Sequence, residues 1–166
     1  AGKGHEFLLH ALAKHRDSRW KLQVVGDGPL RARFEELAAA VGLAERVRFV
    51  GLTDARGVAR YLQASDAFCL FSSYENYSNA VLEAMASGLP VIAADVGGFP
   101  AQISEGENGH LIANNDSEMF LTRLRDLAAN PQMRSRLSAN AARFASRFSW
   151  DATARQVEGI YAELSA

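Results

Sequence analysis

This sequence of 166 residues has little cysteine, no long apolar run and no cluster of positive charge, and each shortage excludes a class of protein. The single cysteine, Cys69, cannot form an internal disulfide and has no metal-ligand pattern near it, so we expect a buried, inert thiol and a cytoplasmic location. No apolar segment approaches the roughly 20 residues of a membrane span, and the first residues do not resemble a signal peptide. The net charge is −1, which gives no reason to expect nucleic acid as a partner.

What the sequence does contain is the composition of an ordinary globular protein, with 48% apolar and 22% charged residues. A chain of this length suits one domain with a sizeable core, and we assign residues 1–166 to a single domain. No internal repeat, low-complexity tract or linker divides it. Peripheral contact with a membrane, through parts outside this sequence, stays open.

Short apolar strands alternate with amphipathic helices along the chain, a pattern typical of βαβ units. Strands are predicted at 21–26, 47–50, 67–71, 90–94 and 110–113, and helices at 5–15, 30–41, 54–63, 78–87, 116–129, 131–147 and 150–164. This order predicts an α/β fold, a Rossmann-like doubly wound parallel sheet with helices on both faces. Because the chain opens on a helix, and such domains usually open on a central strand, we expect the usual first strand to be lacking and the sequence to be a fragment.

The stretch from Ser72 to Gly98 organises these expectations. Its helix is nearly all apolar around one charge, Glu83, and a helix that is apolar on most sides is usually buried. A buried carboxylate is costly unless it is paired. Either Glu83 escapes to solvent or it is a carboxylate held for a ligand, and we favour the ligand.

Four loops should meet where ligands bind in such sheets, beyond the carboxyl ends of the strands. They are 26–29, 51–54, 72–78 and 95–100. If the central helix begins at Ser78, its free N–H groups form an anion site in that crevice. Glu75 precedes the helix and Glu83 lies about a turn and a half into it, so both carboxylates can approach the crevice. Since ionised carboxylates only accept hydrogen bonds and sugar hydroxyls donate them, the combination indicates a nucleotide sugar.

Other signals are weak when taken singly. Gly97-Gly98 follows a strand and would let backbone approach a ligand, although such pairs are equally common in turns. The turn at 26–29 lacks the glycine spacing of a dinucleotide fingerprint, and Lys3 could lie beside a diphosphate or be an exposed terminal lysine. A glycosidase-like carboxylate pair is conceivable, whereas no serine or cysteine sits in a nucleophile elbow. The histidines, read as solvated or partly packed, are His5, His10, His15 and His110.

Taken together, the motifs resemble the C-terminal domain of family 4 glycosyltransferases, which are retaining enzymes of GT-B fold. The matching segments are Lys3-Gly4, VGDGP at 25–29, VRFVG at 47–51, the glutamate pair with its LEAMASGLPVIA run, Gly97-Gly98, GENG at 106–109 and FSW at 148–150. They follow the family's order over essentially the whole chain. Two features depart from the family: Ala101 stands where glutamate often follows the proline, and the usual strand and arginine before Lys3-Gly4 are absent.

The resemblance implies a role for each site residue. Glu75 and Lys3 would be catalytic, because Glu75 would contact hydroxyls of the transferred sugar and Lys3 would neutralise the leaving diphosphate. Glu83 would accept the ribose hydroxyls of the donor. The remaining donor-binding residues would be Asn76, Tyr77, Ser78 and Asn79 near the sugar and diphosphate, Gly26, Gly28, Arg48 and Gly51 around the base, and Gly97 and Gly98 against the ligand.

The implied function is donor binding in a retaining glycosyltransferase that moves a sugar from a nucleoside-diphosphate sugar to an acceptor, without a cofactor or metal ion. An N-terminal domain outside this sequence would bind the acceptor, so we expect the chain alone to bind donor weakly and not to turn over. Two alternatives stay open: a noncatalytic nucleotide-sugar-binding or interaction module, and a sugar-nucleotide epimerase. The intact glutamates speak against the first, and the lack of further acids or histidines near the crevice speaks against the second.

Overall fold

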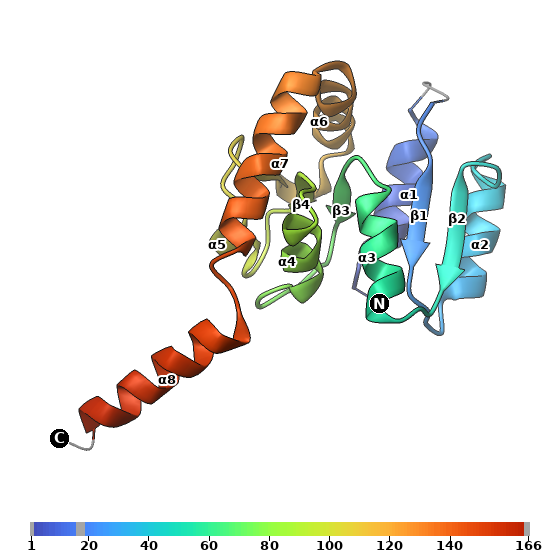
Figure 1. Ribbon diagram of the computed structural model, residues 1–166. Coiled ribbons are helices and arrows are strands. Elements are labelled where there is room, and N and C mark those ends of the chain that lie inside the picture. Colours follow the sequence, from blue (N-terminus) through green and yellow to red (C-terminus); the bar gives the residue numbers. More distant parts are fainter. Residues whose placement is uncertain (1, 16–18, 165–166) are drawn as a thin grey trace.

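The strands of this chain form two parallel sheets that lie edge to edge. The computed structural model describes residues 2–15 and 19–164. In one sheet β1 (Leu22–Val25) pairs with β2 (Val47–Gly51), and the other has the order β3 (Phe68–Leu70), β4 (Val91–Ala94), β5 (Gly109–Ile112). The predicted parallel α/β architecture is confirmed. The strands form two sheets, because within the described residues no hydrogen-bond ladder joins β1 to β3 (Figure 1), which is compatible with the expectation that the usual first strand is lacking.

Each helix predicted from the sequence is present, and most begin at a residue whose side chain can accept an N-terminal hydrogen bond. They are α1 (His5–Ala13), α2 (Arg31–Ala40), α3 (Ala55–Gln63), α4 (Asn79–Ala86), α6 (Ser117–Ala129), α7 (Pro131–Ala145) and α8 (Trp150–Leu164). Asp54 caps α3 by accepting from the Gly57 N–H at 2.7 Å. The structure adds a four-residue helix, α5 (Phe99–Gln102), which is too short to show a periodic pattern in the sequence.

Strand β4 lies at the centre of the larger sheet, and its four residues are fully buried. Its alternate side chains enter two different cores. Ile92 and Ala94 pack with residues of α1, α2 and α6, whereas Val91 and Ala93 pack with residues of α4, α5 and α7. Helices therefore cover both faces, as the doubly wound pattern predicts (Figure 1).

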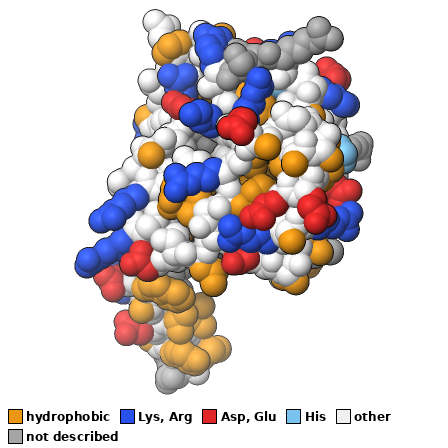
Figure 2. All heavy atoms as spheres, turned by 90° about the vertical axis from the view of Figure 1, so that its right-hand side faces the viewer, with side chains coloured by type: hydrophobic (Ala, Val, Ile, Leu, Met, Phe, Trp, Pro, Cys, Tyr) orange, Lys and Arg blue, Asp and Glu red, His pale blue; other side chains and the backbone are white. Residues whose placement is uncertain are grey.

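The C-terminal helix α8 extends away from the body of the protein (Figure 1) and has no buried residue. Its apolar side chains form the exposed orange surface at the lower end of Figure 2, where Trp150 is 89% and Leu164 79% exposed. These residues lie on the apolar face that the sequence pattern predicts for this helix. Among the described residues, no helix has both the length and the apolarity needed to cross a membrane.

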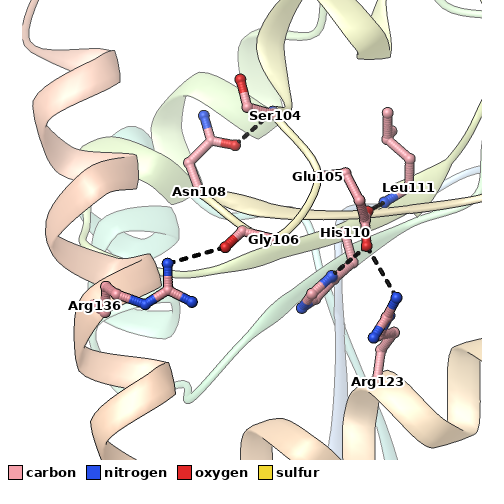
Figure 3. Close-up of polar contacts among 8 residues, drawn as sticks. All are labelled: Ser104, Glu105, Gly106, Asn108, His110, Leu111, Arg123 and Arg136. Atoms are coloured by element: carbon pink, nitrogen blue, oxygen red, sulfur yellow. Dashed lines mark hydrogen bonds and ion pairs between the residues drawn. The ribbon is translucent and has the colours of Figure 1, made fainter.

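Two single-residue expectations have different outcomes. Cys69 in β3 is half-buried and not fully buried as expected, but desolvation raises the pKa of its thiol to about 12, as expected for an unreactive thiol. The interpretation of His110 as solvated or partly packed is wrong, because this side chain is buried and its Nδ1 lies 2.9 Å from Glu105 Oε1 (Figure 3). Helices cover both faces of β5, so even the polar position of this strand is buried, and Glu105 supplies its polar partner.

Candidate functional site

Helix α4 follows the carboxyl end of β3 and begins one residue after the predicted start, with Ser78 as its N-cap. The Ser78 hydroxyl accepts from the Val81 N–H at 3.4 Å, and the residue is 3% exposed. Within the described residues, the N–H groups of Asn79 and Ala80 have no acceptor. A helix end with free N–H groups at the edge of a parallel sheet can hold an anion such as phosphate.

The expectation that Glu83 lies in a buried environment is wrong. Val81, Ala84 and Met85 form the buried face of α4, and Glu83 lies on its exposed face. The helix looked apolar on most sides because its exposed face carries alanines, which have no preference for burial strong enough to define a face. Glu83 forms no side-chain hydrogen bond or ion pair within the part of the chain that the structure describes. Its carboxylate is therefore available to a ligand, without the electrostatic cost inferred from the sequence.

Glu75 and Lys3, far apart in the sequence, are brought together at this edge of the sheet. Lys3 Nζ lies 2.7 Å from Glu75 Oε2, and the Ser72 hydroxyl donates to the same oxygen at 3.3 Å. The lysine side chain is 58% exposed and the glutamate side chain 18%, so Glu75 is the more fixed partner. A cation and a carboxylate at one point can contact a phosphate and a sugar hydroxyl at the same time.

The segment carrying Lys3 is held against the end of β3 by backbone contacts. The Ser73 N–H donates to the Gly2 carbonyl at 2.7 Å. Gly4 has φ of 74°, and a Cβ atom there would lie 2.1 Å from the Phe71 carbonyl oxygen. Only glycine fits this position, which explains the glycine after Lys3 and fixes the place where the lysine leaves the backbone.

Gly97 and Gly98 pack on the loop that carries Glu75. A Cβ atom on Gly97 would lie 2.2 Å from the Glu75 carbonyl oxygen, and one on Gly98 would lie 1.4 Å from that of Asn76. The Gly98 N–H also donates to the Glu75 carbonyl at 2.7 Å. These glycines thus allow two backbone segments of the site to touch each other, and their contact with a ligand stays a prediction.

The segments expected around a base also meet, at the ends of β1 and β2. The Gly26 N–H donates to the Gly51 carbonyl at 2.9 Å. Gly28 has open space where a Cβ would be, and Arg48 is exposed. Arg31, which the sequence analysis missed, donates to the Phe49 carbonyl at 3.3 Å and lies against Gly51. Its guanidinium forms part of this corner, and no motif in the sequence indicates it.

The side chains of Tyr74, Asn76 and Tyr77, on either side of Glu75, lie at the protein surface. Tyr74 is 72% exposed and its hydroxyl donates to Asn76 Oδ1 at 2.7 Å. The Tyr77 ring lies with its centroid 5.8 Å from that of Phe148, which follows α7. Partial burial raises the pKa of Tyr77, so this phenol stays neutral at physiological pH. Within the described residues, no group of three or more histidine, cysteine, aspartate or glutamate side chains is placed to hold a metal ion.

Fold and geometry together define the class: a Rossmann-like α/β domain with a helix end, a lysine and a carboxylate at one edge of its sheet. Residues 1–144 match the family of glycosyl transferases group 1, and the chain belongs to this family. Its architecture matches that of GT-B neighbours among solved structures.

Individual relatives support this assignment. The chain is 32% identical to a D-inositol 3-phosphate glycosyltransferase from Corynebacterium efficiens, over 97% of this chain and 40% of that protein. Sucrose-phosphate synthase from Thermosynechococcus elongatus superposes with a TM-score of 0.88 at 32% identity, over 98% of this chain and 42% of that one. HepE from Anabaena, solved in complex with UDP-glucose, superposes with a TM-score of 0.88 at 26% identity, over 97% and 45% of the two chains. The chain thus spans about two fifths of the length of the curated relatives it matches.

Proposed function

We propose that this chain binds the donor of a retaining glycosyltransferase, a nucleoside-diphosphate sugar whose sugar moves to an acceptor. The observation that carries the proposal is that Lys3, Glu75 and the N-terminus of α4, whose first N–H groups are unpaired within the described residues, lie at one edge of the sheet. Family membership supports it, as does the structure of HepE, a relative at 26% identity, in complex with UDP-glucose.

The bond that breaks joins the anomeric carbon to the diphosphate oxygen, and its electron pair leaves with the diphosphate. In this proposal Lys3 and the N–H groups at the start of α4 stabilise that negative charge, so no metal ion is required. Glu75 accepts hydrogen bonds from hydroxyls of the transferred sugar. Since Lys3 and Glu75 pair with each other at 2.7 Å, the donor would insert its phosphate and hydroxyl groups around this pair.

The nucleoside would lie between the other segments. Glu83, exposed and free of other side-chain partners within the described part of the chain, would accept the ribose hydroxyls. Gly26, Gly28, Arg48 and Gly51 would surround the base, at the corner where the Gly26–Gly51 hydrogen bond joins their two loops. The acceptor would be bound by a part of the protein outside this sequence. Cytoplasmic residence and a place in glycan biosynthesis also stay predictions.

The test is a titration of the isotopically labelled chain with UDP, GDP and ADP, followed through its amide NMR signals, which detect even weak binding. We expect one of the three to shift signals at 26–28, 48–51 and 75–79, while signals of α6 stay in place. Glu83→Ala should weaken this binding about tenfold, the effect of losing hydrogen bonds to a charged group. Glu118→Ala, which changes an exposed acid at the start of α6, is the matched control.

Two results contradict the proposal: no shifts with any of the three nucleotides at millimolar concentration, or shifts confined to another surface. The noncatalytic alternative needs a separate measurement, because the exposed position of Glu83 removes the argument that a buried charge must be functional. Sugar release from the matching nucleotide sugar, assayed in the longer protein with Lys3→Ala as the comparison, distinguishes an enzyme from a binding module. An epimerase would instead return the sugar still attached to its nucleotide.

A further inference from the structure

Gln102 is a buried polar side chain that none of the site motifs includes. It lies at the C-terminal end of α5 and is 1% exposed. Its Oε1 accepts from the Ser78 N–H at 2.8 Å, and its Nε2 donates to the Ser78 carbonyl at 3.0 Å. One amide group thus binds both backbone groups of the residue that caps α4. Burying an amide is costly unless it is hydrogen-bonded, and here the partner is the start of the candidate anion site.

These two hydrogen bonds act together with the first helical bond of α4, in which the Leu82 N–H donates to the same Ser78 carbonyl at 3.2 Å, to fix which way the neighbouring peptide groups point. In a planar trans peptide the C=O and N–H groups point in opposite directions. Because the Ser78 carbonyl points at Gln102, the N–H of Asn79, which belongs to the same peptide plane, points away from Gln102. That N–H has no acceptor within the described residues.

A second layer of hydrogen bonds fixes Gln102 in turn. The Asn108 side chain, 4% exposed, donates to the Gln102 carbonyl at 3.0 Å, and its Oδ1 accepts from the Ser104 N–H at 2.8 Å (Figure 3). Arg136 of α7 donates to the Gly106 carbonyl of the same loop at 3.1 Å. The loop after α5 is therefore anchored to a long helix.

Helix α5 and its N-cap residue Gly98 hold both ends of the loop that carries Glu75. Gly98 binds the Glu75 carbonyl at the start of this loop, and Gln102 binds Ser78 at its end. Residues 75–78 are thus fastened to α5 at both ends, one end by a backbone contact and the other by a side chain. Of these two attachments, only the one through Gln102 can be removed without changing the backbone.

We propose that Gln102 is a positioning residue, which orients the Asn79 N–H and the start of α4 toward the diphosphate of the donor. This inference rests on the proposed function. Gln102 acts through Ser78 and has no contact with the donor itself. Its loss should therefore weaken the recognition of phosphate and leave the recognition of the nucleoside unchanged.

Gln102→Met tests this, because methionine has a similar length and shape but forms neither hydrogen bond. Affinity is measured for the nucleoside diphosphate that binds in the titrations above, chosen from UDP, GDP and ADP, and for its parent nucleoside, which has no phosphate. We expect the diphosphate to bind about tenfold more weakly and the nucleoside to bind within twofold of the unsubstituted chain. Ile103→Val, a mild change at the next buried residue, is the control and should alter neither affinity.

Equal loss of both affinities in Gln102→Met would show a purely structural role and overturn the inference. Unchanged diphosphate binding would overturn it as well. If the variant does not fold, the unsubstituted chain decides: the Asn79 amide proton must move downfield with the nucleoside diphosphate and stay in place with the nucleoside. A chain that binds none of the three diphosphates refutes the proposed function instead, so the two failures are distinguishable.

Discussion

The two sheets of this protein differ in how completely they are covered. In the three-stranded sheet, every residue of β4 is buried between helices on both faces. In the two-stranded sheet, β1 is half-buried and its last residue, Val25, is exposed. The proposed phosphate and sugar contacts come from the covered sheet, and the proposed base contacts come from the open one. The loop with the phosphate and sugar contacts follows β3, a half-buried edge strand, but it is held by α5, which packs in the same core as the fully buried β4.

The largest expected effect comes from shortening a buried side chain in the three-stranded sheet. Ile92→Ala in β4 should lower the free energy of unfolding by about 2–5 kcal/mol, because a fully buried side chain leaves a cavity. Val24→Ala in half-buried β1 should cost roughly 1 kcal/mol, since fewer buried methyl groups are lost. Urea unfolding of both variants measures the difference. Equal losses would mean that the two halves are packed alike.

The next effect concerns two glycines without positive φ, one in each half. Gly98→Ala places a methyl group 1.4 Å from the Asn76 carbonyl oxygen, so the loop carrying Glu75 must move, at a cost of about 1–3 kcal/mol. Gly28→Ala meets no atom within 4 Å and should change the stability by less than about 0.5 kcal/mol. Thermal unfolding gives the two costs, and amide NMR shifts at 75–79 show whether the loop moved. A displaced loop in the Gly28 variant would contradict this interpretation of the glycines.

A smaller effect depends on pH and belongs to the covered half. Burial alone would raise the pKa of Glu105, but hydrogen bonds from His110 and the Leu111 N–H, with the charge of Arg123, lower it below the ordinary value of 4.5 (Figure 3). A carboxylate with a lowered pKa stabilises the folded state above its unfolded-state pKa and loses this contribution as the pH falls through its folded-state pKa. Because the Glu105 side chain is 47% exposed, we expect at most about 1 kcal/mol.

Comparison of the unsubstituted chain with Glu105→Gln tests this pH dependence. The difference in thermal midpoint should shrink as the pH falls below about 4.5 and be lost as the pH falls through the lowered folded-state pKa of Glu105. Glu107→Gln, in the same loop, is the control, because its side chain forms no ion pair among the described residues. A difference for Glu105→Gln that persists at the lowest pH would assign its role to packing.

The sequence was sufficient for the order of strands and helices, because alternating strand and helix patterns and capping residues such as Ser78 are local signals. It was misleading for Glu83, since alanines at exposed positions of an eight-residue helix imitate an apolar environment. The roles of Gly98 and Gln102 could not be predicted from the sequence. Each contacts backbone about twenty residues away in the sequence, and neither a glycine nor a glutamine in a loop carries a pattern that names its partner. Such contacts are known only when the fold brings the segments together.

The smallest effect concerns the boundary between the two sheets, where Cys69 lies on β3, the strand that faces β1. Because burial raises the pKa of its thiol to about 12, almost no thiolate forms at neutral pH, and the thiolate is the reactive species. We expect a disulfide reagent at pH 8 to label Cys69 far more slowly than in chain unfolded with guanidinium, which is the reference rate. Cys69 is half-buried, so slow labelling would reflect both the raised pKa and the partial cover of its thiol. A rate close to the unfolded reference would show that the fold gives this thiol no protection and would contradict the raised pKa.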